Sequence, residues 1–176
     1  TATLRTDGSS KFAKAYRWGW FPSVSLGWNI SNEPFMESAE GVDLKFRISY
    51  GKTGNQEGIG NYAYQPKLSA GYNYGNESGF AVSDFGNEQL TWEKADQFDV
   101  GLDMGFFDDR LTFIVDAYLK NTNDLLYSMP VHGTTGRTSM LTNIGSMRNM
   151  GLEFTVGGSL ELGKVHWDSN LNISTN

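Results

Sequence analysis

The chain has 176 residues, of which 39% are hydrophobic, 14% aromatic and 19% charged, a length that suits one domain or a piece of one. Its 14 lysines and arginines against 20 aspartates and glutamates give a net charge of −6, which argues against the clustered basic surface of a nucleic-acid binder. Because it has no cysteine, the chain holds no disulfide framework, thiolate metal site or thiol nucleophile.

The hydrophobic pattern repeats every two residues along most of the chain, which predicts strands and not helices. Between Leu44 and Tyr50, for example, Leu, Phe, Ile and Tyr alternate with Lys, Arg and Ser. Taken in chain order, the alternation predicts about seven strands, at residues 1–6, 18–30, 43–52, 90–107, 110–127, 144–162 and 165–176.

Two pairs of predicted strands are joined by tight turns, at Asp108-Asp109 and Gly163-Lys164. When each turn is closed by pairing its two flanking residues, apolar residues face one another along one side of both hairpins. The predicted pairs are Phe106–Leu111, Met104–Phe113, Leu102–Val115, Val100–Ala117, Leu160–Trp167, Val156–Leu171 and Phe154–Ile173. A slip of one residue would bring polar groups to the apolar side, so the pattern itself selects this register.

The other connections are longer and polar, at residues 7–17, 53–89 and 121–143. An intermediate connection, residues 31–42, contains a predicted helical turn at residues 32–36, since proline is tolerated at a helix start. Short turns therefore alternate with long loops, which places the turns at one end of the sheet and the loops at the other. Loops of this length are uncommon in compact domains unless they are functional.

Alternating strands arise either in a two-layer sandwich, with the apolar face inside, or in an outer-membrane barrel, with the apolar face toward lipid. Three features favour the barrel: the separation of turns from loops, strands reaching about 50 Å at about 3.3 Å per residue, and aromatic residues near strand ends. Those aromatic residues are Trp18, Trp20, Tyr50, Trp92, Phe106, Phe107 and Trp167. We therefore predict an all-β, antiparallel transmembrane β-barrel segment, and the alternative is a secreted all-β carbohydrate-binding module.

Several motifs, in this order, resemble those of the SusC/RagA family of TonB-dependent outer-membrane transporters of Bacteroidota. They are RTDGSSKF (5–12), RWGWFPSVSLGWNISNEPFM (17–36), LKFRISYGKTGNQ (44–56), LTWEKADQFDVGLDMGFFDDRL (90–111), DAYLKNTNDLL (116–126) and NIGSMRNMGLEF (143–154). The resemblance covers nearly the whole chain. One departure is Glu88, where the family usually has proline, and it concerns only the loop before residue 90.

The resemblance implies a barrel of about 22 strands with an internal plug, of which residues 1–176 match a later part of the wall. The plug and the periplasmic segment that engages the TonB complex have no counterpart here. In the family, a SusD-like surface lipoprotein caps the barrel and delivers oligosaccharides or peptides, and TonB then pulls on the plug. The resemblance thus implies a multi-pass outer-membrane transporter without cofactor or enzymatic activity, in which this piece supplies wall, loops and lid-contact surface but does not transport alone.

Five charged residues are predicted to face the lumen. They are Lys45, Arg47, Asp99, Asp103 and Asp116. Asp99 and Asp103 are about 13 Å apart along one strand, against about 5–9.5 Å for the carboxyl pair of a glycosidase, and we interpret them as hydrated wall. Lys45 and Arg47 are expected to pair with carboxylates of neighbouring strands or of the plug.

Four tyrosines of the long loop are candidates for ligand or lid contact, because an aromatic ring offers an apolar face and a polar tip. They are Tyr62, Tyr64, Tyr72 and Tyr74. Loop packing and interfacial anchoring is the plainer interpretation, and the one we favour.

His132 and His166 have no third ligand at metal spacing, so no metal site is predicted.

Overall fold

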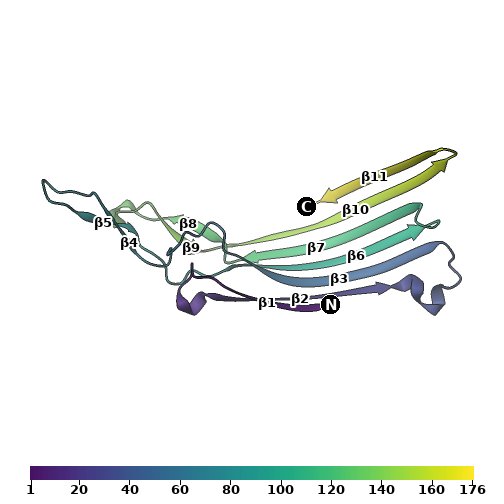
Figure 1. The fold of residues 1–176 in the computed structure, drawn as a ribbon, viewed down its shortest axis with the longest axis horizontal. Helices are drawn as coiled ribbons and strands as arrows, with labels where there is room; N and C mark the ends of the chain where they lie inside the picture. Colours follow the sequence, from purple (N-terminus) through teal and green to yellow (C-terminus); the bar gives the residue numbers. More distant parts are fainter.

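The computed structural model describes residues 1–176 as one long antiparallel sheet with two short hairpins beyond one end (Figure 1). The sheet has seven strands in the order β1-β2-β3-β6-β7-β10-β11. Each long strand therefore pairs with the long strand before it and the long strand after it in the chain. The strands are β1 (Ala2–Gly8), β2 (Trp18–Asn29), β3 (Val42–Asn55), β6 (Glu93–Phe106), β7 (Leu111–Asn123), β10 (Ser146–Leu162) and β11 (Val165–Thr175). The hairpins are β4 (Lys67–Ala70) with β5 (Phe80–Asp84), and β8 (Leu126–Pro130) with β9 (Ser139–Asn143).

The helical content is four single 3-10 turns, η1 (Lys14–Tyr16), η2 (Ile30–Asn32), η3 (Pro34–Met36) and η4 (Gly133–Thr135). The predicted turn at residues 32–36 is therefore present, in 3-10 form, and Pro34 occupies its first turn as expected. No helix of the chain has the length and apolarity needed to span a membrane.

All seven predicted strands are present, and the four strands of the two hairpins are an addition that the sequence did not predict. The hairpin strands have only four or five residues each, too few for a period of two to stand out among Gly, Asn and Tyr. The predicted strand at 110–127 is broken: β7 ends at Asn123, and β8 begins at Leu126 after Asp124, whose φ is +58°.

The predicted register is confirmed at every pair named for the β6–β7 and β10–β11 hairpins. Gly163 takes a φ of +65° at the first position of its turn. Phe107, Asp108 and Asp109 have φ of +58°, +57° and +63°. The positive φ of Asp108 and Asp109 is what a type I′ turn requires at its two central residues, and the ladder itself ends at the pair Phe106–Leu111. The turn chemistry and the apolar pairing therefore specify the same register.

Because the register from β2 to β11 is unbroken, residues on one side of the sheet form straight rows across several strands. The apolar face carries the rows Tyr50–Phe98–Leu119–Met150, Leu26–Ile48–Val100–Ala117–Leu152, Trp28–Phe46–Leu102–Val115–Phe154–Ile173 and Leu44–Met104–Phe113–Val156–Leu171. The opposite face carries polar rows such as Gly27–Arg47–Gly101–Asp116–Glu153–Ser174. The sheet is thus amphipathic across its whole width.

The apolar face of this sheet has no second layer packed on it. Figure 1 shows the long strands as one curved layer. Phe98, which lies on the central strand β6, is 41% exposed. Only 12 of 176 residues are buried, far fewer than a sandwich of this length requires. This observation contradicts the two-layer body that a secreted binding module would need.

Turns and loops separate as predicted. The β6–β7 and β10–β11 turns and the β2–β3 connection lie at one end of the sheet, and the loops bearing both hairpins lie at the other (Figure 1). The loop end holds the only cluster of buried apolar side chains, formed by Phe12, Phe21, Ile59, Ala63, Leu90 and Trp92.

One prediction about the aromatic residues is wrong. Trp92 was expected at the lipid interface, but it is 4% exposed inside the loop-end cluster. Its ring lies 5.2 Å from that of Phe12 and 5.5 Å from that of Phe21, and its Nε1 donates to the Arg17 carbonyl at 3.2 Å. For an aromatic residue just before a strand, the sequence pattern does not distinguish a side chain that faces lipid from one that packs under a loop. Trp18, by contrast, lies on the apolar face and is 65% exposed.

Candidate functional site

The polar face of the sheet is built from alternate residues of β3, β6 and β7. Period-two alternation places Arg47 of β3, Asp103 of β6 and Asp116 of β7 on this side, opposite the apolar rows. Arg47 faces Gly101 in the ladder, and Gly101 in turn faces Asp116. The three charged side chains therefore converge from three successive strands.

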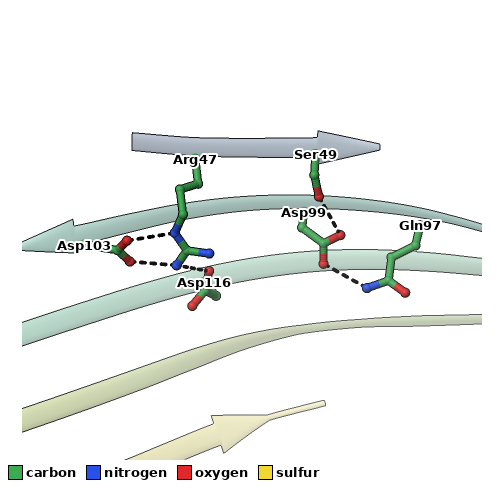
Figure 2. Close-up of polar contacts among 6 residues, drawn as sticks. All are labelled: Arg47, Ser49, Gln97, Asp99, Asp103 and Asp116. Carbon is green, nitrogen blue, oxygen red and sulfur yellow. Dashed lines mark hydrogen bonds and ion pairs between the residues drawn. The ribbon is translucent and has the colours of Figure 1, made fainter. Parts of the chain in front are cut away.

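Arg47 binds both carboxylates through its guanidinium (Figure 2). Its Nε donates to Asp103 Oδ2 at 2.9 Å, and its Nη2 donates to Asp103 Oδ1 at 2.7 Å and to Asp116 Oδ1 at 3.0 Å. The pair with Asp103 is bidentate, the geometry in which arginine binds carboxylate with the greatest directional specificity. All three side chains are half-exposed, so solvent screening limits what the network adds to stability.

Glycine at position 101 makes the link between β3 and β7 possible. A Cβ built there would clash first with Asp116 Oδ1, and it would lie 2.8 Å from Nη2 and 2.9 Å from Cζ of Arg47, inside van der Waals contact. Gly27, on the other side of Arg47 in the same row, is different, because a Cβ there would meet only Lys45 Cε at 3.8 Å. The guanidinium crosses β6 over a residue that has no side chain.

A second group of polar contacts lies farther along β6. Asp99 accepts a hydrogen bond from Ser49 Oγ at 3.2 Å and another from Gln97 Nε2 at 3.0 Å (Figure 2). Lys45 stands opposite Asp103 in the ladder but forms no ion pair, since Asp103 is taken by Arg47. The five predicted wall residues thus share one face, and four of them take part in direct side-chain contacts.

The two histidines do not join any metal-binding group. His132 caps the 3-10 turn η4, where its Nδ1 accepts from the Thr134 backbone N–H at 3.3 Å. His166 Nε2 lies 2.9 Å from Asp168 Oδ2 on the same strand. No set of three or more His, Cys, Asp or Glu side chains is arranged to hold a metal ion.

The four candidate tyrosines do not form one site. Tyr62 and Tyr64 precede β4, and the Tyr64 hydroxyl accepts from Gln65 Nε2 at 3.2 Å. Tyr72 and Tyr74 lie in the tip between β4 and β5, where Tyr74 is 91% exposed. The β4–β5 hairpin extends farthest from the sheet (Figure 1). Ring faces at the tip are therefore open to a partner, and no packing contact occupies the Tyr74 ring.

Sequence reasoning missed the residue that joins the two long loops. Asn143 Oδ1 accepts from the Thr91 backbone N–H at 2.9 Å, and its Nδ2 donates to the Thr91 carbonyl at 2.9 Å and to the Asp124 carbonyl at 2.8 Å. These three bonds connect the strand β9 with the segment before β6 and with the end of β7. Nothing in the sequence around Asn143 signals this, because the contact depends on how both loops fold.

A sheet with one apolar and one polar face, tight turns at one end and long loops at the other is the arrangement of an outer-membrane barrel wall. The sequence pattern of the family described as "TonB dependent receptor-like, beta-barrel" matches residues 1–176. The chain belongs to the TonB-dependent receptor β-barrel family.

Individual relatives agree with this assignment. The chain is 40% identical to the TonB-dependent receptor P39 of Formosa agariphila, over 100% of the chain and 17% of the relative. It is 39% identical to the TonB-dependent receptor SusC of Bacteroides thetaiotaomicron, over 100% of the chain and 18% of the relative. The chain thus spans less than a fifth of these curated relatives.

Solved structures give the same answer. The chain superposes on the RagAB peptide importer in its closed-closed state with a TM-score of 0.87 and 37% identity, over 98% of this chain and 19% of that one. A siderophore receptor, PirA from Pseudomonas aeruginosa, matches at 14% identity with a TM-score of 0.54, which shows a shared fold alone. The TonB-dependent receptor β-barrel assignment confirms the resemblance found in the sequence motifs.

Proposed function

We propose that the full-length protein imports oligosaccharides or peptides across the outer membrane in a TonB-dependent manner, without catalysing a reaction. This chain supplies seven membrane-crossing strands of the barrel wall and the extracellular loops that follow them. The observation that carries the proposal is a fully amphipathic single-layer sheet that superposes on a peptide importer over 98% of the chain.

The dimensions of the apolar face suit a bilayer. On β6, apolar residues on this face run from Phe98 to Phe106, eight residue steps or about 27 Å at about 3.4 Å per residue. At a strand tilt of about 45° this is about 19 Å of height, and side chains extend it toward the apolar band of about 25 Å of outer-membrane barrels. Facing lipid also explains why large apolar side chains remain exposed here without forming a core.

The polar face then lines the lumen, with Lys45, Arg47, Asp99, Asp103 and Asp116 as wall. The network of Arg47 fixes three adjacent strands on the side along which the substrate travels. Most of this face is composed of Ser, Thr, Asn, Gly and carboxylates, which suits a hydrated passage.

The proposed partners are suggested by the similarity to SusC and to the RagAB peptide importer. We assign to the loop end a SusD-like surface lipoprotein as lid, and to a segment outside this chain the contact with the TonB complex. We propose that the exposed rings of Tyr72 and Tyr74, at the tip of the farthest hairpin, contact that lid or stack on sugar rings, and that Tyr62 and Tyr64, which precede β4, take part in the same contact.

The test uses the full-length protein in its native organism. An affinity-tagged copy is expected to fractionate with the outer membrane and to co-purify with a lipoprotein encoded beside it. Deletion of the gene is expected to abolish uptake of a labelled oligosaccharide or peptide, and loss of TonB is expected to have the same effect. Uptake that persists without TonB, or a protein that purifies without detergent, would contradict the proposal.

A further inference from the structure

Three connections of the chain meet at the loop end of the sheet. They are residues 9–17 between β1 and β2, residues 56–92 between β3 and β6, and residues 124–145 between β7 and β10. Each begins and ends in a strand of the sheet, so the contacts among them lie wholly within this chain. The buried cluster takes Phe12 from the first connection and four residues, among them Trp92, from the second. Leu126 and Leu141 of the third connection pack against it, so all three share one core.

The short segment before β6 binds the third connection through polar contacts. We call this segment, residues 87–93, the hub. Asn87 Nδ2 donates to the Leu141 carbonyl at 3.2 Å. Glu93 Oε2 accepts from the Leu126 backbone N–H at 3.3 Å. Since Leu126 begins β8 and Leu141 lies in β9, the hub holds both strands of that hairpin.

The hub also binds the first connection. The Arg17 carbonyl accepts from the Ser9 backbone N–H at 3.0 Å, which closes this connection into a loop. The same carbonyl accepts from Trp92 Nε1 of the hub at 3.2 Å. The Trp92 ring lies 5.2 Å from the ring of Phe12, which is completely buried. The hub therefore bridges the first and third connections.

Both hairpins are anchored in the shared core at their bases. The β4–β5 hairpin lies between Ala63 and Leu90 in the chain, and both of these residues are buried. The β8–β9 hairpin has Leu126 in one strand and Leu141 in the other, and both pack against the cluster. The tips, by contrast, are exposed, as at Tyr74. Loosening one hairpin at its base therefore removes side chains from a core on which the other connections depend.

We infer that the three connections form one cooperative unit that is ordered or loosened as a whole, so that ordering of either hairpin is transmitted to the others through the hub. Proteins open locally in contiguous cooperative units. Here each connection that leaves exposes the apolar side chains of the others and strips their carbonyls of donors. The two states are the ordered and the loosened loop end, and a contact that favours one state at one hairpin favours it throughout. The inference goes beyond import, because it holds for any ligand or partner that orders a hairpin.

Hydrogen exchange of the full-length protein in lipid vesicles tests the inference. Phe12→Ala removes a buried ring from the first connection, and we expect amides of residues 67–84 and 126–143 to exchange at least about tenfold faster. Unchanged protection of β7 and β10 is expected to show that the wall is assembled. The matched control is Phe35→Ala, which removes an exposed ring from η3 at the turn end and is expected to leave all three connections unchanged. Faster exchange confined to residues 9–17 would overturn the inference.

The reverse direction gives an independent arm. Leu141→Ala removes a side chain from the third connection, and because coupling is reciprocal it is expected to speed exchange in residues 9–17. Parent rates there would show that the first connection is ordered on its own, against the single unit. Where Phe12→Ala does not assemble, Phe12→Leu replaces it and is expected to give a smaller change of the same sign in all three connections. A change in the first connection alone again contradicts the inference.

A reversible cross-link tests transmission from one hairpin to the other. Ala70 and Phe80 are direct partners in β4 and β5, and the chain has no cysteine of its own. In the double variant Ala70→Cys with Phe80→Cys, oxidation closes a disulfide that favours the ordered hairpin. We expect exchange in residues 126–143 to slow by about twofold or more on oxidation and to recover with dithiothreitol. Equal rates in the oxidised and reduced forms would overturn the transmission between hairpins.

Discussion

The long sheet and the loop end of this molecule are held together in opposite ways. The sheet is fixed by its ladder of backbone hydrogen bonds, and its side chains remain partly exposed on both faces. The loop end is where Phe12 and Leu90 are completely buried and where Trp92 packs between two other aromatic rings. The molecule therefore packs like a water-soluble protein only at the loop end.

This difference follows from the solvent that each part meets. A strand in a bilayer satisfies its backbone through its neighbours and leaves its apolar side chains to lipid, so it needs no core. The loop end projects into water, where loops of this length keep one shape only by burying apolar side chains among themselves. The following variants test that contrast, and each is made in the full-length protein.

The largest effect is expected for Trp92→Ala. Removing a buried aromatic ring typically costs about 3–5 kcal/mol, and here the cost falls on the loop-end cluster. Hydrogen exchange is expected to show lost protection in residues 56–92, with β7 and β10 unchanged. The matched control is Trp18→Ala, which removes the same ring from the exposed face. Equal effects of the two variants would show that the loop end has no core of its own.

Val115→Arg tests the apolar face of the sheet. An arginine near mid-bilayer is expected to cost about 2–4 kcal/mol, because its charge must leave water for hydrocarbon. The adjacent Ile114→Arg places the same side chain on the polar face, beside Asp103 in the ladder, and is expected to cost much less. Unfolding by urea in lipid vesicles measures both. Similar losses of unfolding free energy in Val115→Arg and Ile114→Arg would mean that the two faces of the sheet do not meet different solvents.

Asn143→Leu tests the link between the two loops. The substitution keeps the shape of the side chain, removes three hydrogen bonds and leaves half-buried backbone groups of Thr91 and Asp124 unpaired, at a cost of about 1–3 kcal/mol. We expect faster proteolytic cleavage around β8 and β9. The control Asn61→Leu changes an exposed asparagine of the long loop. Cleavage at the parent rate in Asn143→Leu would rule out the link as a determinant of loop order.

Gly101→Ala is expected to have the smallest effect, about 1 kcal/mol, because the added methyl group pushes the half-exposed Asp116 carboxylate and Arg47 guanidinium apart. Gly27→Ala, in the same row, adds a methyl group that meets nothing closer than Lys45 and should leave stability unchanged. Urea unfolding of the two variants measures the difference. If Gly27→Ala is the more damaging of the two, the crossing of β6 by Arg47 has no energetic role.

The sheet could be predicted from sequence because its information is local. A period of two is visible within one strand, and a two-residue turn determines the register of the strands that flank it. The pairing of β3 with β6 is different, since the long loop between them imposes no register. The contact of Arg47 with Asp116 therefore could not be derived, although the alternation does place both residues on the polar side of the sheet.

The loop end could not be predicted, because the contacts that hold it together join residues that are far apart in the sequence. Trp92 and Asn143 act through partners that are distant in sequence, Phe12 in one case and Thr91 in the other. Neither residue carries a pattern that distinguishes burial from exposure. The strands of the short hairpins were missed for a further reason: with four or five residues, they are below the length at which alternation can be recognised.

The unbroken rows of the sheet limit how this family can change during evolution. Inserting one residue within a central strand such as β7 would exchange the two faces for the rest of that strand and expose Asp116 or Lys120 to hydrocarbon. Length changes in the wall must therefore come in pairs of residues or be absorbed by a bulge, whereas the hairpin tip around Tyr74 can lengthen freely. Under the proposed import function, new substrates are thus expected to be acquired by rebuilding loops on a wall of constant register.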